Sequence, residues 1–121
     1  MKYMLLIYED EKSWAKFSES ERQQFFGEYM QFTKEVQDSG HYKAGAPLQP
    51  TSTATNVRVR NGKRVVTDGP FAETREQLGG YYLVDARDLD DAISIAARIP
   101  SVRWGTIEVR PVMEVPAPAG S

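Results

Sequence analysis

The chain has 121 residues, the size of one domain, and a chain of this length buries roughly two-thirds of its unfolded surface without covalent staples. It has no cysteine and a single histidine, His41, which excludes disulfides, thiolate metal sites and multi-histidine metal sites within one chain; we expect no metal and no cofactor. The 15 basic and 17 acidic residues give a net charge of -2 without any basic run, so no nucleic-acid partner is expected. The opening apolar run is too short to span a bilayer and quickly reaches acidic residues, unlike a signal peptide, so we expect a cytoplasmic protein with no membrane partner.

The first half of the chain predicts a strand, a helix and a second strand. Residues 2–9 are expected to form a strand whose apolar run from Tyr3 to Tyr8 has no polar alternation, so both of its faces should be covered. Ser18 and Glu21 have the spacing of a capping box, and apolar residues recur at helical spacing from Phe25 to Val36. Gly40 stands where a left-handed cap would end this helix, and residues 42–48 are expected to form a short strand.

The second half predicts a hairpin followed by another strand, helix and strand. Asn61-Gly62 is a strong turn signal, and it places Arg60 opposite Lys63 and residue 55 opposite residue 68. Residues 72–79 are expected to be a loop or one helical turn, and residues 80–86 a strand with two apolar faces. A helix should run from its cap at Asp88 to Pro100, and a last strand over 105–112. The Pro- and Ala-rich tail 116–121 is predicted to be disordered.

This order of elements predicts an α+β fold of the ferredoxin-like split βαβ type with an inserted hairpin. In that arrangement both helices lie on one face of an antiparallel sheet, yet the strands over 2–9 and 80–86 are apolar on both faces. The simplest cover for the other face is the same sheet of a second copy, which would make a homodimer built as a dimeric α+β barrel. The alternative is that loop 68–80 folds over the sheet.

Few residues are candidates for chemistry. His41 is the side chain that ordinarily titrates near neutral pH, and Asp68, at the end of a strand, could orient its ring if the two meet. The alternative interpretation makes His41 a capping or surface residue and Asp68 a turn starter. Glu108 and Arg110 share one face of the last strand, where they could line a polar pocket or a solvated edge. No nucleophile-elbow or phosphate-loop motif occurs.

The segment Val-Thr-Asp-Gly-Pro-Phe-Ala-Glu-Thr at 66–74, with Glu-Gln-Leu-Gly-Gly-Tyr-Tyr at 76–82 and Ile-Glu-Val-Arg-Pro at 107–111, resembles the DGPF branch of the YCII-related family. The resemblance covers residues 1–115, which we take as one domain. It implies a ferredoxin-like fold assembled as a dimeric α+β barrel, and a cleft in which His41 and Asp68 face each other as an acid–base pair. It also implies relatives that are cofactor-free lyases or dehalogenating enzymes acting on small cyclic compounds, and a link to extracytoplasmic-function sigma factors.

Three functions are therefore open. In the first, the chain is a cofactor-free enzyme of lyase or isomerase type, with His41 and Asp68 as the acid–base pair. Its pocket for a small cyclic ligand would have walls that include Tyr8, Phe71, Glu108 and Arg110. In the second, the chain is a ligand-sensing or partner-binding module that works with a sigma-factor system. In the third, it is a structural dimer without a small-molecule role.

Overall fold

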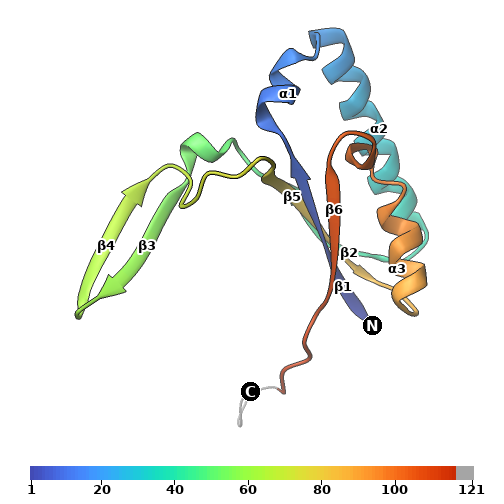
Figure 1. The fold of residues 1–121 in the computed structure, drawn as a ribbon. Coiled ribbons are helices and arrows are strands. Elements are labelled where there is room, and N and C mark those ends of the chain that lie inside the picture. The colour runs from blue at the N-terminus through green and yellow to red at the C-terminus, as the bar shows by residue number, and fades with distance from the viewer. Residues whose placement is uncertain (117–121) are drawn as a thin grey trace.

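The computed structural model describes residues 1–116, and its elements follow the predicted order with a few additions (Figure 1). The strands are β1 (Lys2–Glu9), β2 (Tyr42–Pro47), β3 (Thr55–Arg60), β4 (Lys63–Asp68), β5 (Gln77–Asp85) and β6 (Thr106–Pro111). The helices are α1 (Glu11–Lys16), α2 (Glu19–Asp38) and α3 (Leu89–Ala96), with 3-10 turns η1 (Thr51–Thr53) and η2 (Pro100–Arg103).

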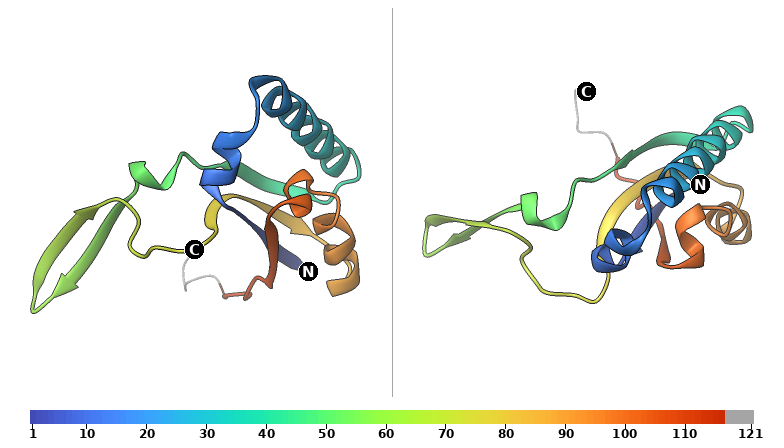
Figure 2. Two further views of the ribbon diagram at one scale, coloured as in Figure 1. Left: turned by 45° about the horizontal axis from the view of Figure 1, so that its top comes forward. Right: turned by 90° about the horizontal axis from the view of Figure 1, so that it is seen from above.

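The main sheet is antiparallel and has the strand order β2-β5-β1-β6, with β1 and β5 at its centre. Helices α2 and α3 lie together on one face of this sheet (Figure 2). This is the ferredoxin-like α+β arrangement that the order of elements predicts, and it confirms the expected fold class. Among residues 1–116, no helix is long and apolar enough to cross a membrane.

The core lies between β1, β5 and the two long helices. Tyr3, Leu5 and Ile7 of β1 are buried toward the helices, whereas Met4 and Leu6 between them stay half-exposed on the other face. Strand β5 alternates in the same way, because its pairing places Leu83 opposite Met4 and Tyr81 opposite Leu6. The sheet therefore has one face covered by helices and one half-exposed apolar face without helices, which we call the open face. The core consists of Tyr3, Leu5, Ile7, Phe32, Val36, Tyr82, Val84, Ala86, Ala92, Ile95, Ala96 and Ile99.

The predicted local signals are confirmed at the helix ends. Ser18 and Glu21 form the capping box, with Ser18 Oγ accepting from the Glu21 N–H and the Glu21 carboxylate accepting from the Ser18 N–H. Gly40 has φ 81°, the left-handed conformation that glycine adopts most easily after a helix. Asp88 caps α3 through the Asp91 N–H.

The structure differs from the sequence-based expectations in three places. Residues 77–79 are not loop but the start of β5, because Gln77 pairs with Glu9 at the end of β1. Helix α1 was not expected; Asp10 caps it by accepting from the Lys12 N–H. Helix α3 ends at Ala96, before the predicted stop at Pro100, which instead begins η2. Of the tail predicted to be disordered, residues 117–121 lie outside the described part of the chain.

Strands β3 and β4 form a separate two-stranded sheet that projects from the main body (Figure 1). Their register places Thr55 opposite Asp68 and Arg60 opposite Lys63, as the turn signal predicts. Asn61 (φ 54°) and Gly62 (φ 73°) both adopt the left-handed conformation that a tight two-residue hairpin turn requires.

Candidate functional site

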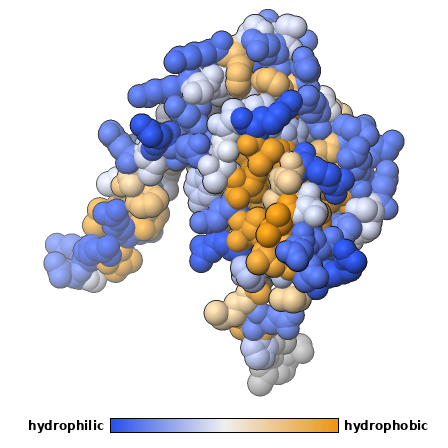
Figure 3. Space-filling view, turned by 45° about the vertical axis from the view of Figure 1, so that its right-hand side comes forward, coloured by the Kyte–Doolittle hydropathy of each residue, from blue (hydrophilic) through white to orange (hydrophobic). Residues whose placement is uncertain are grey.

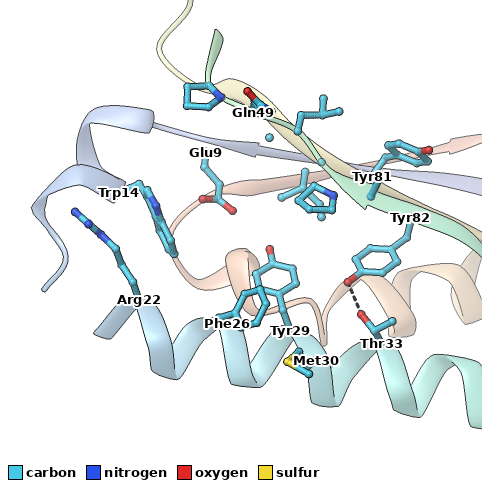
Figure 4. Close-up of a pocket in the computed structure, with 18 of the residues that line it drawn as sticks. Glu9, Trp14, Arg22, Phe26, Tyr29, Met30, Thr33, Gln49, Tyr81 and Tyr82 are labelled. Carbon is cyan, nitrogen blue, oxygen red and sulfur yellow. Dashed lines mark hydrogen bonds between the residues drawn. The ribbon is translucent and has the colours of Figure 1, made fainter. Parts of the chain in front are cut away.

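A pocket of about 930 Å³ lies between α2 and the neighbouring ends of β1, β2 and β5 (Figure 4). This volume is within the range of small-molecule sites. Its walls combine aromatic, aliphatic and polar side chains, the usual composition of a site that holds an organic ligand and fixes its orientation. The labelled lining residues in Figure 4 are Glu9, Trp14, Arg22, Phe26, Tyr29, Met30, Thr33, Gln49, Tyr81 and Tyr82.

The polar centre of the pocket is a chain of hydrogen bonds from α2 to β1. Ser101 Oγ donates to Glu9 Oε1, and Tyr29 Oη is hydrogen-bonded to the same serine oxygen. Because a serine hydroxyl has one proton and Ser101 uses it toward Glu9, Tyr29 must donate to Ser101. The hydrogen bonds formed among residues 1–116 leave the second carboxylate oxygen of Glu9 without a protein partner. Glu9 can therefore accept a hydrogen bond from a ligand.

The turn η2 holds the serine at the centre of this series of hydrogen bonds. Ser101 is fully buried, and its carbonyl accepts the Gly105 N–H at 2.7 Å, which closes the turn beneath the end of β1. Gly105 lies so close to β1 that a Cβ there would be 2.2 Å from the Tyr8 carbonyl oxygen and 3.2 Å from Glu9 Cγ. Only glycine fits this close approach, so the position of Glu9 depends on a residue near the opposite end of the chain.

The apolar wall of the pocket comes mainly from α2. Phe26 and Met30 are 67% and 61% exposed, although both are large apolar side chains on a helix that packs on the sheet. Deeper in the pocket, Thr33 and Tyr82 join α2 to β5 through a hydrogen bond of 2.7 Å between their hydroxyls (Figure 4). An apolar surface of this kind beside a buried polar chain suits a ligand with an apolar ring and one polar group.

The outer end of the pocket is held by α1. Glu11 accepts from Thr51 twice, at the backbone N–H and at the side-chain hydroxyl, both at 2.9 Å. Arg22 donates from Nη2 to the Ala15 carbonyl at 2.9 Å, while its buried Nε has no hydrogen-bond partner in the described part of the chain. An unpaired buried N–H has lost its hydration without compensation, so Arg22 is a second place where a ligand could form a hydrogen bond.

Alkaline titration should report on the hydrogen-bonded series that contains Tyr29. Burial, and then the nearby Glu9 charge, raise the pKa of Tyr29, and burial raises the pKa of Tyr82. A tyrosine pKa raised by folding stabilises the folded state below the unfolded value of about 10, and this contribution is lost as pH rises further. We therefore expect two tyrosines to ionise last when tyrosinate absorbance is followed against pH. Tyr29→Phe and Tyr82→Phe should each remove one of these late steps; if Tyr29→Phe removes an early step instead, the Tyr29 hydroxyl is not buried as described.

His41 lies outside this pocket, in a cluster at the start of α3. Its Nδ1 is 2.7 Å from Ser39 Oγ, and its Nε2 is 3.4 Å from Asp91 Oδ2. The N–H of Arg87, and to a lesser degree the charges of Arg87 and His41, hold the pKa of the Asp91 carboxyl below its usual value. Among residues 1–116, no hydrogen bond or ion pair joins His41 to Asp68, which ends β4 in the projecting hairpin.

The other predicted site residues lie on different surfaces. Glu108 and Arg110 are exposed on the open face, where they pair in register with Leu6 and Met4, and Tyr8 lies on the same face. Phe71 is 75% exposed in the segment that follows the hairpin. None of these residues, and neither His41 nor Asp68, lines the pocket. The predicted roles of all these residues stay predictions. The pairing of His41 with Asp68 in addition requires a second copy of the chain.

Sequence reasoning missed Glu9, Ser101 and the polar role of Tyr29. Helical spacing places Tyr29 on the apolar face of α2, and Glu9 is only the last residue of the first predicted strand. A weak signal was present, since Glu9 is a carboxylate directly attached to a buried strand. In the described part of the chain, no group of three or more His, Asp or Glu residues could hold a metal ion.

The sheet, the two helices on one face and the pocket beside α2 define a ferredoxin-like α+β domain with a ligand-sized cavity. A family model described as the YCII-related domain matches residues 1–116, and the chain belongs to this family. The chain is also similar to an uncharacterised protein of Rhizobium meliloti (strain 1021), with 35% identity over 114 residues. That alignment covers 93% of this chain and 92% of the relative.

Proposed function

We propose that this protein binds a small, partly aromatic organic molecule in the pocket beside α2. The observation that carries the proposal is the cavity of about 930 Å³, with an apolar wall on one side and the Glu9 carboxylate on the other. The apolar wall would hold a ring, and Glu9 would accept a hydrogen bond from an O–H or N–H group of the ligand. This agrees with the small cyclic ligand that the family resemblance implies.

The finer proposal is a cofactor-free enzyme of lyase or isomerase type in which Glu9 exchanges a proton with the ligand. A carboxylate can act as a general base if the proton it takes lies within hydrogen-bonding distance, and Glu9 has a free oxygen in the pocket. Ser101 and Tyr29 would hold the carboxylate in place. Ligand binding without turnover would instead favour a sensing module, the role implied by the resemblance to sigma-factor-linked relatives.

The His41–Asp68 pair remains a second candidate for acid–base chemistry, and it depends on dimerisation. We propose that the open face is covered by the same face of a second copy, because its half-exposed apolar side chains form a continuous patch. Within one chain, His41 is engaged with Ser39 and Asp91. An Asp68 that reaches His41 would have to come from the partner's hairpin.

Binding of N-phenyl-1-naphthylamine tests the pocket, because this probe has two aromatic ring systems, one N–H donor, and a fluorescence that rises in apolar surroundings. We expect saturable binding of one probe per chain. Met30→Trp fills the pocket and should weaken binding by about tenfold or more, equivalent to at least ~1.4 kcal/mol. Gln24→Trp is the matched control, since Gln24 is exposed on the same helix but does not line the pocket. Equal affinities for the two variants would contradict the proposal.

Once a compound that the protein turns over is found, variants of Glu9 and His41 separate the two acid–base candidates. Glu9→Gln keeps a hydrogen-bond acceptor, so probe affinity should change little while turnover falls by about 10²-fold or more. His41→Ala should leave turnover unchanged. The reverse pattern would favour the His41–Asp68 pair and exclude Glu9 as the proton-exchanging group.

A further inference from the structure

Among residues 1–116, the hairpin β3–β4 has no packing partner beyond its base. Its strands pair with each other and with no strand of the main sheet, and the hairpin extends well away from the body in every view (Figure 2). A two-stranded hairpin is at best marginally stable in water when nothing packs on it. We propose that this hairpin is an arm that packs on a second copy of the chain through a face formed by Val57, Val59 and Val66, here called the valine face.

The register builds the valine face. Val57 lies directly opposite Val66, and Val59 lies two residues along the same strand, so the three side chains point to one side of the hairpin. They are 62%, 55% and 62% exposed for Val57, Val66 and Val59, respectively. Figure 3 shows apolar atoms gathered on the hairpin between hydrophilic ones. The other side of the hairpin is mainly polar, with Asn56, Arg58, Arg60, Lys63 and Thr67 around one valine, Val65.

The distribution of charge along the chain favours a second copy as the partner of the arm. Of the chain's 15 basic and 17 acidic residues, four basic residues and one acidic residue lie in the hairpin. The hairpin therefore has a net charge of +3, and the remainder of the chain has a net charge of -5. A basic arm is attracted to an acidic body, and both surfaces occur on this one molecule.

The base of the arm is held in place before any partner binds. Thr51, in the turn that leads into β3, is fixed to α1 by both oxygens of Glu11. Beyond β4, the Gly69 N–H donates to the Ala54 carbonyl at 2.8 Å, and Asn56 Nδ2 donates to the Gly69 carbonyl at 2.6 Å. A pre-organised arm loses little conformational entropy on docking, which favours association.

If the arm of one chain packs on a second copy, the arm of that second copy packs on the first chain in return. In a two-fold dimer each arm contacts the other chain through the same residues, so both valine faces would be buried, each on the body of the partner chain. This contact is separate from the proposed pairing of open faces, because it uses residues outside the main sheet. The dimer contact through the open faces can therefore be right or wrong independently of the arm.

Two measurements on the full chain test the arm. The first is the dimer dissociation constant from sedimentation equilibrium for the wild type and for V57T/V59T/V66T. Threonine keeps the branched shape that suits a strand but replaces a methyl group by a hydroxyl, so the hairpin should still form. We expect the triple variant to raise the dissociation constant by about tenfold or more, equal to at least ~1.4 kcal/mol. The matched control V65T, on the other side of the hairpin, should change it much less.

The second measurement uses the absence of cysteine. A spin label on Val65→Cys, on the side of the hairpin away from the contact, in one population mixed with unlabelled ¹⁵N-enriched chains should broaden amide signals of the enriched chains only if the arm reaches across the dimer. A monomeric wild type would overturn the proposal. A dimer that tolerates the triple variant and shows no broadening between chains would also overturn it, and would leave the open faces as the dimer contact.

Discussion

Leu5→Ala is expected to lower the free energy of unfolding by about 2–5 kcal/mol, the range for removing a large aliphatic side chain from a packed core. Leu5 is fully buried in the centre of β1, between the paired strands and the helices above them. The cavity left by the substitution cannot collapse easily, because β1 is held by hydrogen bonds on both of its edges. Urea unfolding followed by circular dichroism measures the loss.

Leu6→Ala is the matched control because it removes the same side chain one residue along the same strand, on the open face. In a dimer built on that face, the cost of Leu6→Ala should depend on protein concentration, since it weakens association. The cost of Leu5→Ala should depend on concentration much less, because it acts on the fold of each chain. A concentration-independent loss for Leu6→Ala as large as that for Leu5→Ala would contradict the assignment of the two faces.

Gly105→Ala is expected to destabilise the fold and to displace the Glu9 carboxylate. The added Cβ would lie 2.2 Å from the Tyr8 carbonyl oxygen, a backbone atom that cannot rotate away, so β1 or η2 must shift. Overpacking of this kind costs about 1–3 kcal/mol. Because Glu9 and Ser101 flank the clash, we also expect binding of N-phenyl-1-naphthylamine to weaken. Both effects are measured on one protein preparation, by unfolding and by fluorescence titration.

Gly27→Ala is the control, because its expected change in stability has the opposite sign. Gly27 lies inside α2, and a Cβ there would meet nothing within 4 Å. Alanine in a helix interior is more favourable than glycine by roughly 0.5–1 kcal/mol, so this variant should be slightly stabilised and should bind the probe normally. If Gly105→Ala behaves like Gly27→Ala, the close packing of η2 on β1 is wrong.

Much of the fold could be predicted because its signals are local. The Asn61-Gly62 turn fixes the register of β3 and β4, and the Ser18–Glu21 capping box fixes the start of α2, each within a few residues of sequence. The apolar character of both faces of β1 predicted a cover on each face; within one chain the open face is half-exposed, and its cover by a second copy stays a prediction. The start of β5 was misplaced because it depends on pairing with Glu9, which is remote in sequence.

The pocket could not be predicted because its parts are far apart. Glu9 and Ser101 are 92 residues apart, and only the packing of η2 on β1 brings them together. Nothing in the local sequence of either residue indicates that contact. His41 and Asp68 were selected for their intrinsic chemistry and for the resemblance; in one chain His41 lies beside Asp91 instead, and the function of the predicted pair stays untested.

The central place of the first strand has a consequence for how the protein is made on the ribosome. Strand β1 lies between β5 and β6, so its first strand partner, β5, is complete only when residue 85 has been synthesised. Until then, its apolar run from Tyr3 to Tyr8 is exposed on the nascent chain, and segments of this kind tend to aggregate. The polar centre of the pocket around Glu9 is completed later still, when Ser101 and Gly105 emerge from the ribosome. The nascent chain of this protein therefore exposes an unpaired apolar segment for most of its synthesis.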